Sequence, residues 1–310
     1  MPPKISIIMP VYNGASFIGD SIHSVLAQTH QDWELIIIDD GSTDGSRKIV
    51  ESFKDARIQY DYQENAGVSA ARNKAIRLSQ GKWLAFIDAD DVWLPEKLSA
   101  QLPFCSSSDL VFSDCYFIKE GTQTTELFSA SSSIPANRDP GLSYLLSHNN
   151  FIPLLTVIAK KESVVAAGMF DHGIKHGEDF DLWLRMKAQG AQFAYIGRPL
   201  GAYRVHPSSA SSDYGKMIYG DYALLKKYIS LDLPMKEVAR SRSKIILKHY
   251  LTYMRIATLP FGDRIKLLIK SVDASYAPKF VLSQILFTIF PRLTLHKTRK
   301  TTTHELRKVK

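Results

Sequence analysis

The sequence predicts an α/β fold in which helices flank a mostly parallel sheet, followed by a helical, basic C-terminal extension. Three observations lead to this prediction. Apolar runs of strand length alternate with segments of helical periodicity. Two of these runs end directly in acidic residues, as strands do where their carboxyl ends border a ligand crevice. Finally, residues 216–310 hold 20 Lys and Arg against 6 Asp and Glu, whereas residues 1–215 carry a net charge of −6.

The N-terminal part gives the clearest strand signals. Each expected strand is short and apolar and is followed by residues that break regular structure. Helical segments connect the strands through short links, which favours right-handed crossovers between parallel strands. Strands are expected over 5–9, 33–38, 57–60 and 82–87, and helices over 17–26, 49–53 and 67–78.

The middle of the chain gives weaker signals. We expect one or two strands within 109–117, a short helix over 142–146 and strands over 153–159 and 193–196. The Ser- and Thr-rich segment 121–140 is expected to be a mobile loop, and a lid over a ligand site and an inert surface loop both fit its composition.

Three carboxylates, Asp88, Asp90 and Asp91, follow the strand expected over 82–87. Clustered carboxylates repel one another unless a cation joins them. Oxygen ligands of this kind favour Mg²⁺ or Mn²⁺, which takes one or two carboxylates together with the phosphates of a nucleotide. We expect Asp88 and Asp90 to serve such a cation. Asp91 fits that role and that of an acid at the start of the next helix equally.

Asp179 is the candidate proton acceptor. It lies near the start of a helix expected after Gly177, and its face of that helix is otherwise apolar. The apolar residues that share this face are Leu182, Trp183 and Met186. Partial burial would raise the pKa of the Asp179 carboxyl and make it a better base at neutral pH. Glu178 suits a helix-dipole role better, and Asp181 and Arg185 are expected to pair in solvent.

His206 ends a stretch that follows the strand expected over 193–196. A neutral imidazole at this position is a candidate metal ligand or diphosphate contact, and a structural or surface histidine is the alternative. The two cysteines, Cys105 and Cys115, have no metal-ligand spacing and indicate structural thiols in a reducing compartment.

The order and spacing of six stretches within residues 4–207 resemble the family-2 inverting glycosyltransferases with the GT-A fold. No single stretch would be specific, but their succession is. The stretches are 6–13, 39–44, 65–73, 86–91, 178–179 and 203–206.

This resemblance implies a role for each of a set of residues around a nucleotide-sugar donor. The nucleotide would be bound by Pro10, Tyr12, Asp39, Asp40, Arg72 and Asp88. The divalent metal, Mn²⁺ or Mg²⁺, would be held by Asp90, Asp88 and His206. Asp179 would be the general base that deprotonates the acceptor hydroxyl, with Glu178 and Trp183 contacting the acceptor. The reaction would be one in-line displacement that inverts the anomeric centre.

The resemblance also divides the chain. Residues 1–212 would form the GT-A catalytic domain, with a nucleotide half over about 1–118 and an acceptor half over about 119–212. Residues 213–310 would form a helical basic region, in which the apolar segment 280–290 is shorter than the roughly 20 residues that span a bilayer. Helices lying on an anionic membrane surface and a bundle packed on the catalytic domain both fit this region.

The expected function is transfer of a sugar from a nucleotide-diphosphate donor, with a UDP-sugar as the first expectation, to a glycan or lipid-linked hydroxyl in bacterial-type cell-surface polysaccharide biosynthesis. The first residues carry no apolar secretory segment, so we expect a cytoplasmic protein on the inner face of the membrane. We expect no nucleic-acid partner, because the basic charge is confined to the tail. The alternatives are a polyprenyl-phosphate glycosyltransferase, a metal-dependent nucleotidyltransferase and a non-catalytic nucleotide- or calcium-binding module.

Overall fold

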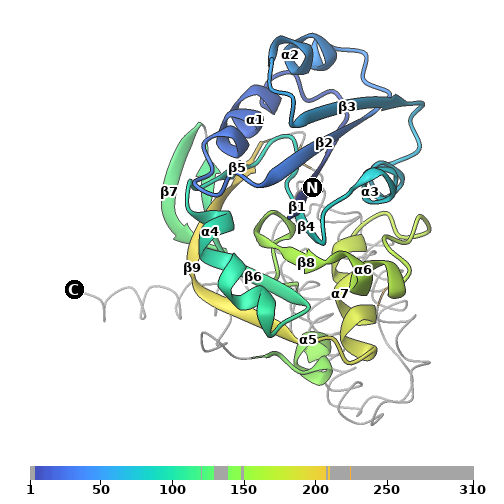
Figure 1. The fold of residues 1–310 in the computed structure, drawn as a ribbon, viewed down its shortest axis with the longest axis vertical. Helices are drawn as coiled ribbons and strands as arrows, with labels where there is room; N and C mark the ends of the chain where they lie inside the picture. Colours follow the sequence, from blue (N-terminus) through green and yellow to red (C-terminus); the bar gives the residue numbers. More distant parts are fainter. Residues whose placement is uncertain are drawn as a thin grey trace, which may run out of the picture. The chain divides into compact units, whose positions relative to one another are not determined.

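The structure is a computed structural model that describes residues 4–119, 121–128, 139–147, 150–206, 209 and 224 (Figure 1). All of these residues belong to one compact unit, Met1–Ile245. The helical basic region expected over 213–310 lies outside the described residues apart from Leu224. Within the described part of the chain, no helix is long and apolar enough to cross a membrane.

Four parallel strands form the N-terminal half of a nine-stranded sheet, in the order β3-β2-β1-β4. The strands are β1 (Ile5–Val11), β2 (Trp33–Asp40), β3 (Ile58–Gln63) and β4 (Trp83–Phe86). The connecting helices are α1 (Ile18–Leu26), α2 (Ser46–Ser52) and α3 (Val68–Leu78). β1, β2 and β4 are buried along their whole length, which explains why they appear in the sequence as continuous apolar runs.

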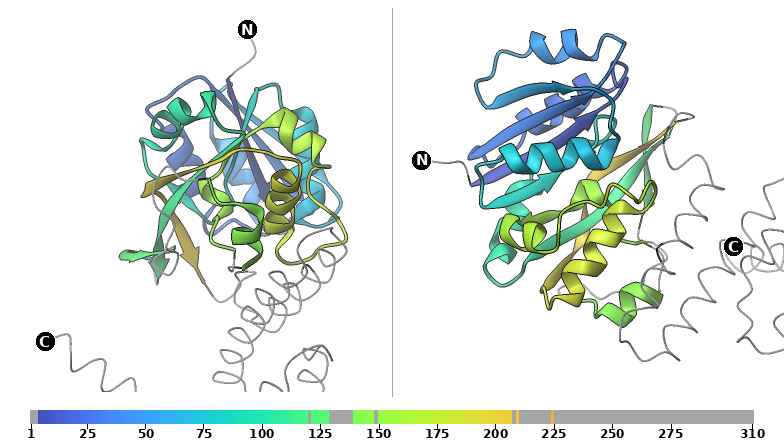
Figure 2. Two further views of the ribbon diagram at one scale, coloured as in Figure 1. Left: turned by 90° about the horizontal axis from the view of Figure 1, so that it is seen from below. Right: turned by 90° about the vertical axis from the view of Figure 1, so that its right-hand side faces the viewer.

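Two apolar layers cover the two faces of these strands. Alternate residues such as Ile7 and Ile8 point to opposite faces, because side chains in a strand alternate. Ile8 belongs to the layer that contains α3 and α7 (Glu178–Ala188), whereas Ile7 belongs to the layer that contains α1 and α2. The right-hand view of Figure 2 shows α3 lying over one face of these strands. Packing of helices on both faces holds these strands in place, and with them the strand ends at which the acidic residues lie.

The second half of the sheet is mixed. Beyond β4 the order continues β8-β6-β9-β5, and β7 pairs with β6 at the side. β6 (Leu110–Lys119) and β9 (Phe193–Val205) are parallel, whereas β8 (Ile158–Lys160), β5 (Val92–Trp93) and β7 (Thr122–Leu127) run antiparallel to their neighbours. The remaining helices are α4 (Lys97–Gln101), η1 (Leu102–Ser106), α5 (Leu142–Ser147), η2 (Leu154–Thr156) and α6 (Lys161–Ala166).

The α/β fold with a mostly parallel sheet is confirmed, with three differences in detail. Residues 122–127, expected in a loop, form strand β7, whose polar residues pair with β6 at the edge of the sheet and lack apolar alternation. The strand expected over 153–159 is shortened by the 3₁₀ turn η2 to 158–160. β9 continues to Val205, so Arg204 lies on a strand and His206 directly follows it. Residues 129–138 of the expected loop lie outside the described residues.

Candidate active site

The acid loop, residues 88–91, follows β4 in the middle of the sheet. The side chains of Asp88 and Asp90 are 31% and 32% exposed, so both carboxylates can reach a ligand. Burial and the nearby charge of Asp88 raise the pKa of Asp90, and its contact with His206 opposes this shift. Two partly buried carboxylates in one loop gain from a cation between them. The metal-binding role of the loop stays a prediction.

Asp91 has a different role from its neighbours. It is 1% exposed, and its Oδ1 accepts the backbone N–H of Arg204 at 2.9 Å. Burial, followed by the charges of Asp90 and Asp88, raises the pKa of this carboxyl well above its ordinary value. The next helix begins only at Lys97, so Asp91 is not an acid at a helix start. It anchors β9 to the acid loop instead.

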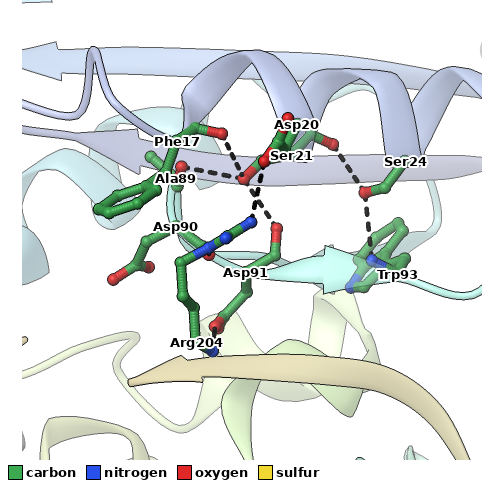
Figure 3. Close-up of polar contacts among 9 residues, drawn as sticks. All are labelled: Phe17, Asp20, Ser21, Ser24, Ala89, Asp90, Asp91, Trp93 and Arg204. Atoms are coloured by element: carbon green, nitrogen blue, oxygen red, sulfur yellow. Dashed lines mark hydrogen bonds and ion pairs between the residues drawn. The ribbon is translucent and has the colours of Figure 1, made fainter. Parts of the chain in front are cut away.

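Helix α1 holds the acid loop from the other side. The hydroxyl of Ser21 contacts the carbonyl oxygens of Ala89 and Asp91 at 2.9 and 2.7 Å. Ser24 accepts the backbone N–H of Trp93, just beyond the loop, at 3.1 Å (Figure 3). The loop backbone is therefore fixed by α1 before any ligand binds.

Asp39 and Asp40, at the end of β2, organise the loops around the expected base pocket. They are 1% and 3% exposed. Asp39 accepts hydrogen bonds from the Ser42 N–H (2.7 Å) and the Tyr60 hydroxyl (2.8 Å). Asp40 accepts from three donors, namely the Gln63 amide and the backbone N–H groups of Ala66 and Gly67. Each carboxylate thus shapes its surroundings, and an interaction with a nucleotide base remains a prediction.

Pro10 and Tyr12 lie at the end of β1, beside β2. Pro10 is buried and paired in register with Ile38, whereas the Tyr12 side chain is 57% exposed. An exposed tyrosine at the carboxyl end of a central strand is available to pack against a ligand. The predicted role of Tyr12 in nucleotide binding is compatible with this position, and the nucleotide-binding role of Pro10 stays a prediction.

Arg72 joins the acid loop to the helix that carries Asp179. Its side chain is 4% exposed, and it donates from Nη2 to Asp88 at 2.7 Å and from Nη1 to Glu178 at 2.6 Å. Burial disfavours the cation, but the two carboxylates more than offset it, so the pKa of Arg72 is raised. Arg72 was predicted to bind the nucleotide and Glu178 to bind the acceptor, but in the structure these two residues form an ion pair with each other.

Asp179 lies on the first turn of α7. Gly177 precedes the helix with φ of 78°, a left-handed conformation that favours glycine. The Asp179 carboxylate accepts from the Asn150 amide at 2.9 Å and from the Phe180 N–H at 2.7 Å. Burial, and then the charge of Glu178, raises its pKa to about 7. A carboxyl with this pKa can accept a proton at neutral pH.

Two predictions about α7 need correction, one on Trp183 and one on the surroundings of the Asp181–Arg185 pair. Trp183, expected to contact the acceptor, is fully buried and its ring lies 6.1 Å from the ring of Phe86, so it supports the helix from within the core. Asp181 and Arg185 do form an ion pair, at 2.7 Å, but Asp181 is fully buried, not solvated. Arg185 also donates to the backbone oxygens of Ala167 and Met169, which ties α7 to the turn before it.

His206 reaches the acid loop from the end of β9. Its Nε2 lies 2.9 Å from Asp90 Oδ2, and its ring packs on Phe17 with centroids 4.7 Å apart. The Asp90 carboxylate is an oxygen donor of the kind that suits Mn²⁺ or Mg²⁺, and the His206 imidazole would add one nitrogen donor, a ligand that is more typical of other transition metals. Within the described residues, however, no three His, Cys, Asp or Glu side chains are grouped closely enough to hold a metal ion by themselves. A cation at this site would need ligands from the donor.

Sequence reasoning missed Asn150, Phe17 and the side-chain contacts of Arg204. Asn150 lies 29 positions before the carboxylate that it contacts, and Arg204 reaches Asp20 across 184 positions. No local pattern could have connected these residues, because only the crossover topology brings them together. Arg204 was identified only as part of the 203–206 stretch.

The chain is similar to known proteins over most of its described length. The family profile "Glycosyl transferase family 2" matches residues 6–164. The Bacillus subtilis protein named "Putative teichuronic acid biosynthesis glycosyltransferase TuaG" is 36% identical over 220 residues, which cover 69% of this chain and 84% of that protein. The Escherichia coli protein named "UDP-Glc:alpha-D-GlcNAc-diphosphoundecaprenol beta-1,3-glucosyltransferase WfgD" is 33% identical over 228 residues, covering 73% and 86%.

Solved structures are similar in fold. S. aureus TarS 1–349 in complex with UDP-GlcNAc has a TM-score of 0.66 at 18% identity, covering 87% of this chain and 82% of that one. The mannosyltransferase PcManGT from Pyrobaculum calidifontis, in complex with GDP-Man and Mn²⁺, has a TM-score of 0.60 at 15% identity, covering 94% and 88%. The profile match, the two sequence relatives and this fold lead to one conclusion: the chain belongs to glycosyl transferase family 2 and is a glycosyltransferase with the GT-A fold.

Proposed function

We propose that this glycosyltransferase moves a sugar from a nucleoside-diphosphate donor, a UDP-sugar, to a hydroxyl of a glycan or lipid-linked acceptor, with inversion at the anomeric carbon. The product would enter cell-surface polysaccharide biosynthesis. The names of TuaG and WfgD, which refer to teichuronic acid and to a diphosphoundecaprenol-linked sugar, support this substrate class. The UDP-GlcNAc bound to TarS supports the choice of donor nucleotide only at the level of the fold.

One observation carries the proposal: Arg72 makes ion pairs with both the acid loop and the first residue of α7. Its two contacts, to Asp88 and Glu178, join segments that lie 16 and 106 positions away from it in the chain. The next residue after Glu178 is the carboxyl whose pKa is about 7. Donor-binding acids and a proton acceptor thereby belong to one connected unit. Such an arrangement suits transfer to a hydroxyl that must lose its proton.

Asp179 would act as the general base. Asn150 and the Phe180 N–H each bond a different oxygen of its carboxylate, which fixes the orientation of the group. A carboxylate oxygen has two lone pairs, so each can still accept the proton of an acceptor hydroxyl. The deprotonated oxygen would attack the anomeric carbon opposite the departing diphosphate, in one displacement. Proton removal of this kind contributes about 10²–10⁴ to the rate.

A divalent cation, Mn²⁺ or Mg²⁺, would be held by Asp90, His206 and Asp88 together with the diphosphate of the donor. When bound, it would supply positive charge that offsets the charge on the departing nucleoside diphosphate. The raised pKa of Asp90 and its 2.9 Å contact with His206 support this assignment. The Mn²⁺ in the complex of PcManGT is consistent with it at the level of the fold.

The protein would work on the inner face of the cell membrane. Residues 216–310, with 20 basic and 6 acidic side chains, would bind the anionic membrane surface and bring the enzyme to a lipid-linked acceptor. Absence of binding to anionic liposomes at low salt would contradict this part of the proposal, while leaving the chemistry of the catalytic domain untouched.

Donor binding is the test of the chemistry. UDP-, GDP-, dTDP- and CMP-sugars are titrated by calorimetry in Mn²⁺ or EDTA, and slow hydrolysis is followed by the released product. We expect metal-dependent binding of the UDP-sugar, loss of that binding in Asp90→Ala, and no change in Asp32→Ala, an exposed acid just before β2. Release of pyrophosphate in place of a nucleoside diphosphate would indicate a nucleotidyltransferase. Absence of binding to all four would refute the proposal.

A further inference from the structure

Arg204, at the end of β9, takes no part in the chemistry proposed above, yet two of its hydrogen bonds go to the acid loop. Its side chain is 11% exposed. Figure 3 shows it lying between the acid loop and the start of α1. A charged side chain is placed at such a depth only when partners compensate for the loss of water.

Three hydrogen bonds tie Arg204 to its surroundings. The backbone N–H donates to Asp91 Oδ1 at 2.9 Å, and Nε donates to the backbone oxygen of Asp90 at 2.7 Å. Nη2 donates to the carboxylate of Asp20, on α1, at 3.0 Å. The guanidinium group thus holds the main chain of the same residue whose carboxylate is assigned to the cation.

Phe17 connects Arg204 to His206. The guanidinium carbon of Arg204 lies 4.9 Å from the centroid of the Phe17 ring, and the imidazole of His206 lies 4.7 Å from it. Both side chains can reach one ring because residues two apart along an extended chain point to the same side. His206 in turn contacts Asp90 Oδ2 at 2.9 Å. Asp90 is therefore held twice, at its backbone by Arg204 and at its carboxylate by His206.

The start of α1 also links this arrangement to the donor. Phe17 and Asp20 follow the loop after Tyr12, and in that loop the Asn13 side chain accepts the N–H of Thr43 at 2.9 Å. The loop after Tyr12, which would bind the nucleotide base, and the acid loop, which would bind the cation, are therefore both connected to the start of α1. A shift of the guanidinium group would move both.

We propose that Arg204 is a positioning residue that sets Asp90 and His206 at the separation needed to bind a divalent cation together with a nucleotide diphosphate. The inference rests on the proposed function, because that function assigns Asp90 and His206 to the cation. Residues that orient metal ligands typically change metal affinity by about 10–100-fold when they are lost.

The test compares Arg204→Met with Arg57→Met. Methionine keeps the length of the side-chain stem but removes every donor, while the backbone bond to Asp91 is retained. Arg57 is a matched control: its guanidinium group stacks on the Trp33 ring at 3.8 Å and pairs with Asp55 at 2.6 Å, but it lies before β3, far along the strands from the acid loop. UDP binding is measured by calorimetry with Mn²⁺ and with EDTA, together with thermal unfolding.

We expect Arg204→Met to weaken UDP binding in Mn²⁺ by about 10–100-fold and to leave UDP binding in EDTA within about twofold of the wild type. Arg57→Met should lower the melting temperature without changing either affinity. Arg204→Lys should rescue binding only in part, because an ammonium group cannot reproduce the planar, forked contacts. Should Arg204→Met fail to fold, Phe17→Leu, which removes the shared aromatic surface, should show a smaller loss that again depends on Mn²⁺.

Two results for Arg204→Met would overturn this inference while leaving the proposed function intact. One is a UDP affinity in Mn²⁺ within about twofold of the wild type. The other is an equal loss of UDP affinity with Mn²⁺ and with EDTA, which would show that Arg204 supports the fold only. A wild-type protein that binds UDP equally well in Mn²⁺ and EDTA would contradict the proposed cation itself, and the inference with it.

Discussion

The substitution Asp179→Asn tests whether the Asp179 carboxylate acts as the general base. The amide is nearly the same size as the carboxyl but cannot accept a proton from the acceptor hydroxyl. We expect kcat to fall by about 10²–10⁴, the usual worth of general-base catalysis, with little change in the affinity for the donor. In the wild type, kcat/KM for the acceptor should rise with pH, reach half of its maximum near pH 7 and level off at higher pH, since the proton of Asp179 must leave before the reaction and its pKa is about 7.

The same substitution should change stability in a pH-dependent way. The carboxyl titrates with a pKa of about 7 in the folded protein against an ordinary value of 3.8, so between these values the folded state holds a proton that the unfolded chain has released. The wild type therefore loses stability as the pH rises from about 4 to 7, and its stability is level with respect to this group above 7. A pKa difference of about three units corresponds to a change of about 4 kcal/mol in the free energy of unfolding. The Asp179 side chain keeps some exposure to solvent, which weakens this effect, so we expect a change of about 2 kcal/mol.

The amide that replaces the carboxyl would have to keep two donors satisfied with a single oxygen, which costs about 1 kcal/mol. As the pH rises from 5 to 8, the free energy of unfolding of Asp179→Asn should therefore increase by about 1–2 kcal/mol relative to that of the wild type. At pH 8 the variant should be the more stable protein by about 1 kcal/mol. Urea unfolding at both pH values and single-turnover assays measure the two effects. Asp181→Asn is the control with the opposite pattern: it loses the buried pair with Arg185 and about 1–3 kcal/mol of stability, but retains turnover.

Retention of more than about a tenth of kcat in Asp179→Asn would refute the role of Asp179 as the base, given the contribution such a group makes. That result would favour a phosphate acceptor, which hardly needs a base, and so a polyprenyl-phosphate glycosyltransferase. A stability difference that does not change between pH 5 and pH 8 would instead refute the raised pKa.

Two further predictions concern other buried basic side chains. Arg72→Gln should lower the free energy of unfolding by about 3–5 kcal/mol in urea, because it leaves Asp88 and Glu178 without their shared cation, and a loss below about 1 kcal/mol would contradict the connecting role of Arg72. Lys97 is fully buried, with the Gln101 amide oxygen at 2.8 Å and the Trp93 ring at 4.3 Å beside its ammonium group, and burial lowers its pKa well below the ordinary value. The unfolded chain therefore binds a proton that the folded chain does not, so as the pH falls below 10 the wild type should lose about 1 kcal/mol per pH unit relative to Lys97→Met. Parallel stability curves for these two proteins would show that Lys97 stays charged in the fold.

The features that could be predicted from the sequence depend on residues close together in the chain. The alternation of strands and helices around β1, β2 and β4 was one of them, because fully buried parallel strands leave continuous apolar runs. The gathering of acids was another, since the carboxyl ends of parallel strands meet at one edge of the sheet. The burial of Asp179 could be anticipated from helical spacing alone.

The contacts between distant groups could not be predicted in this way, because they depend on how the elements pack. Periodicity placed Trp183 on the face of Asp179, but the packing of α7 on the sheet turned its ring against Phe86 and away from any acceptor. The ion pairs of Arg72 and the contacts of Arg204 join segments up to 184 positions apart, and no local pattern encodes such distances. Polar strand β7 formed for the same reason, because pairing with the edge of β6 stabilises it without any apolar face of its own. The sequence alone therefore determined which residue types occur in the site, and the crossover connections of the sheet determined which of these residues are in contact.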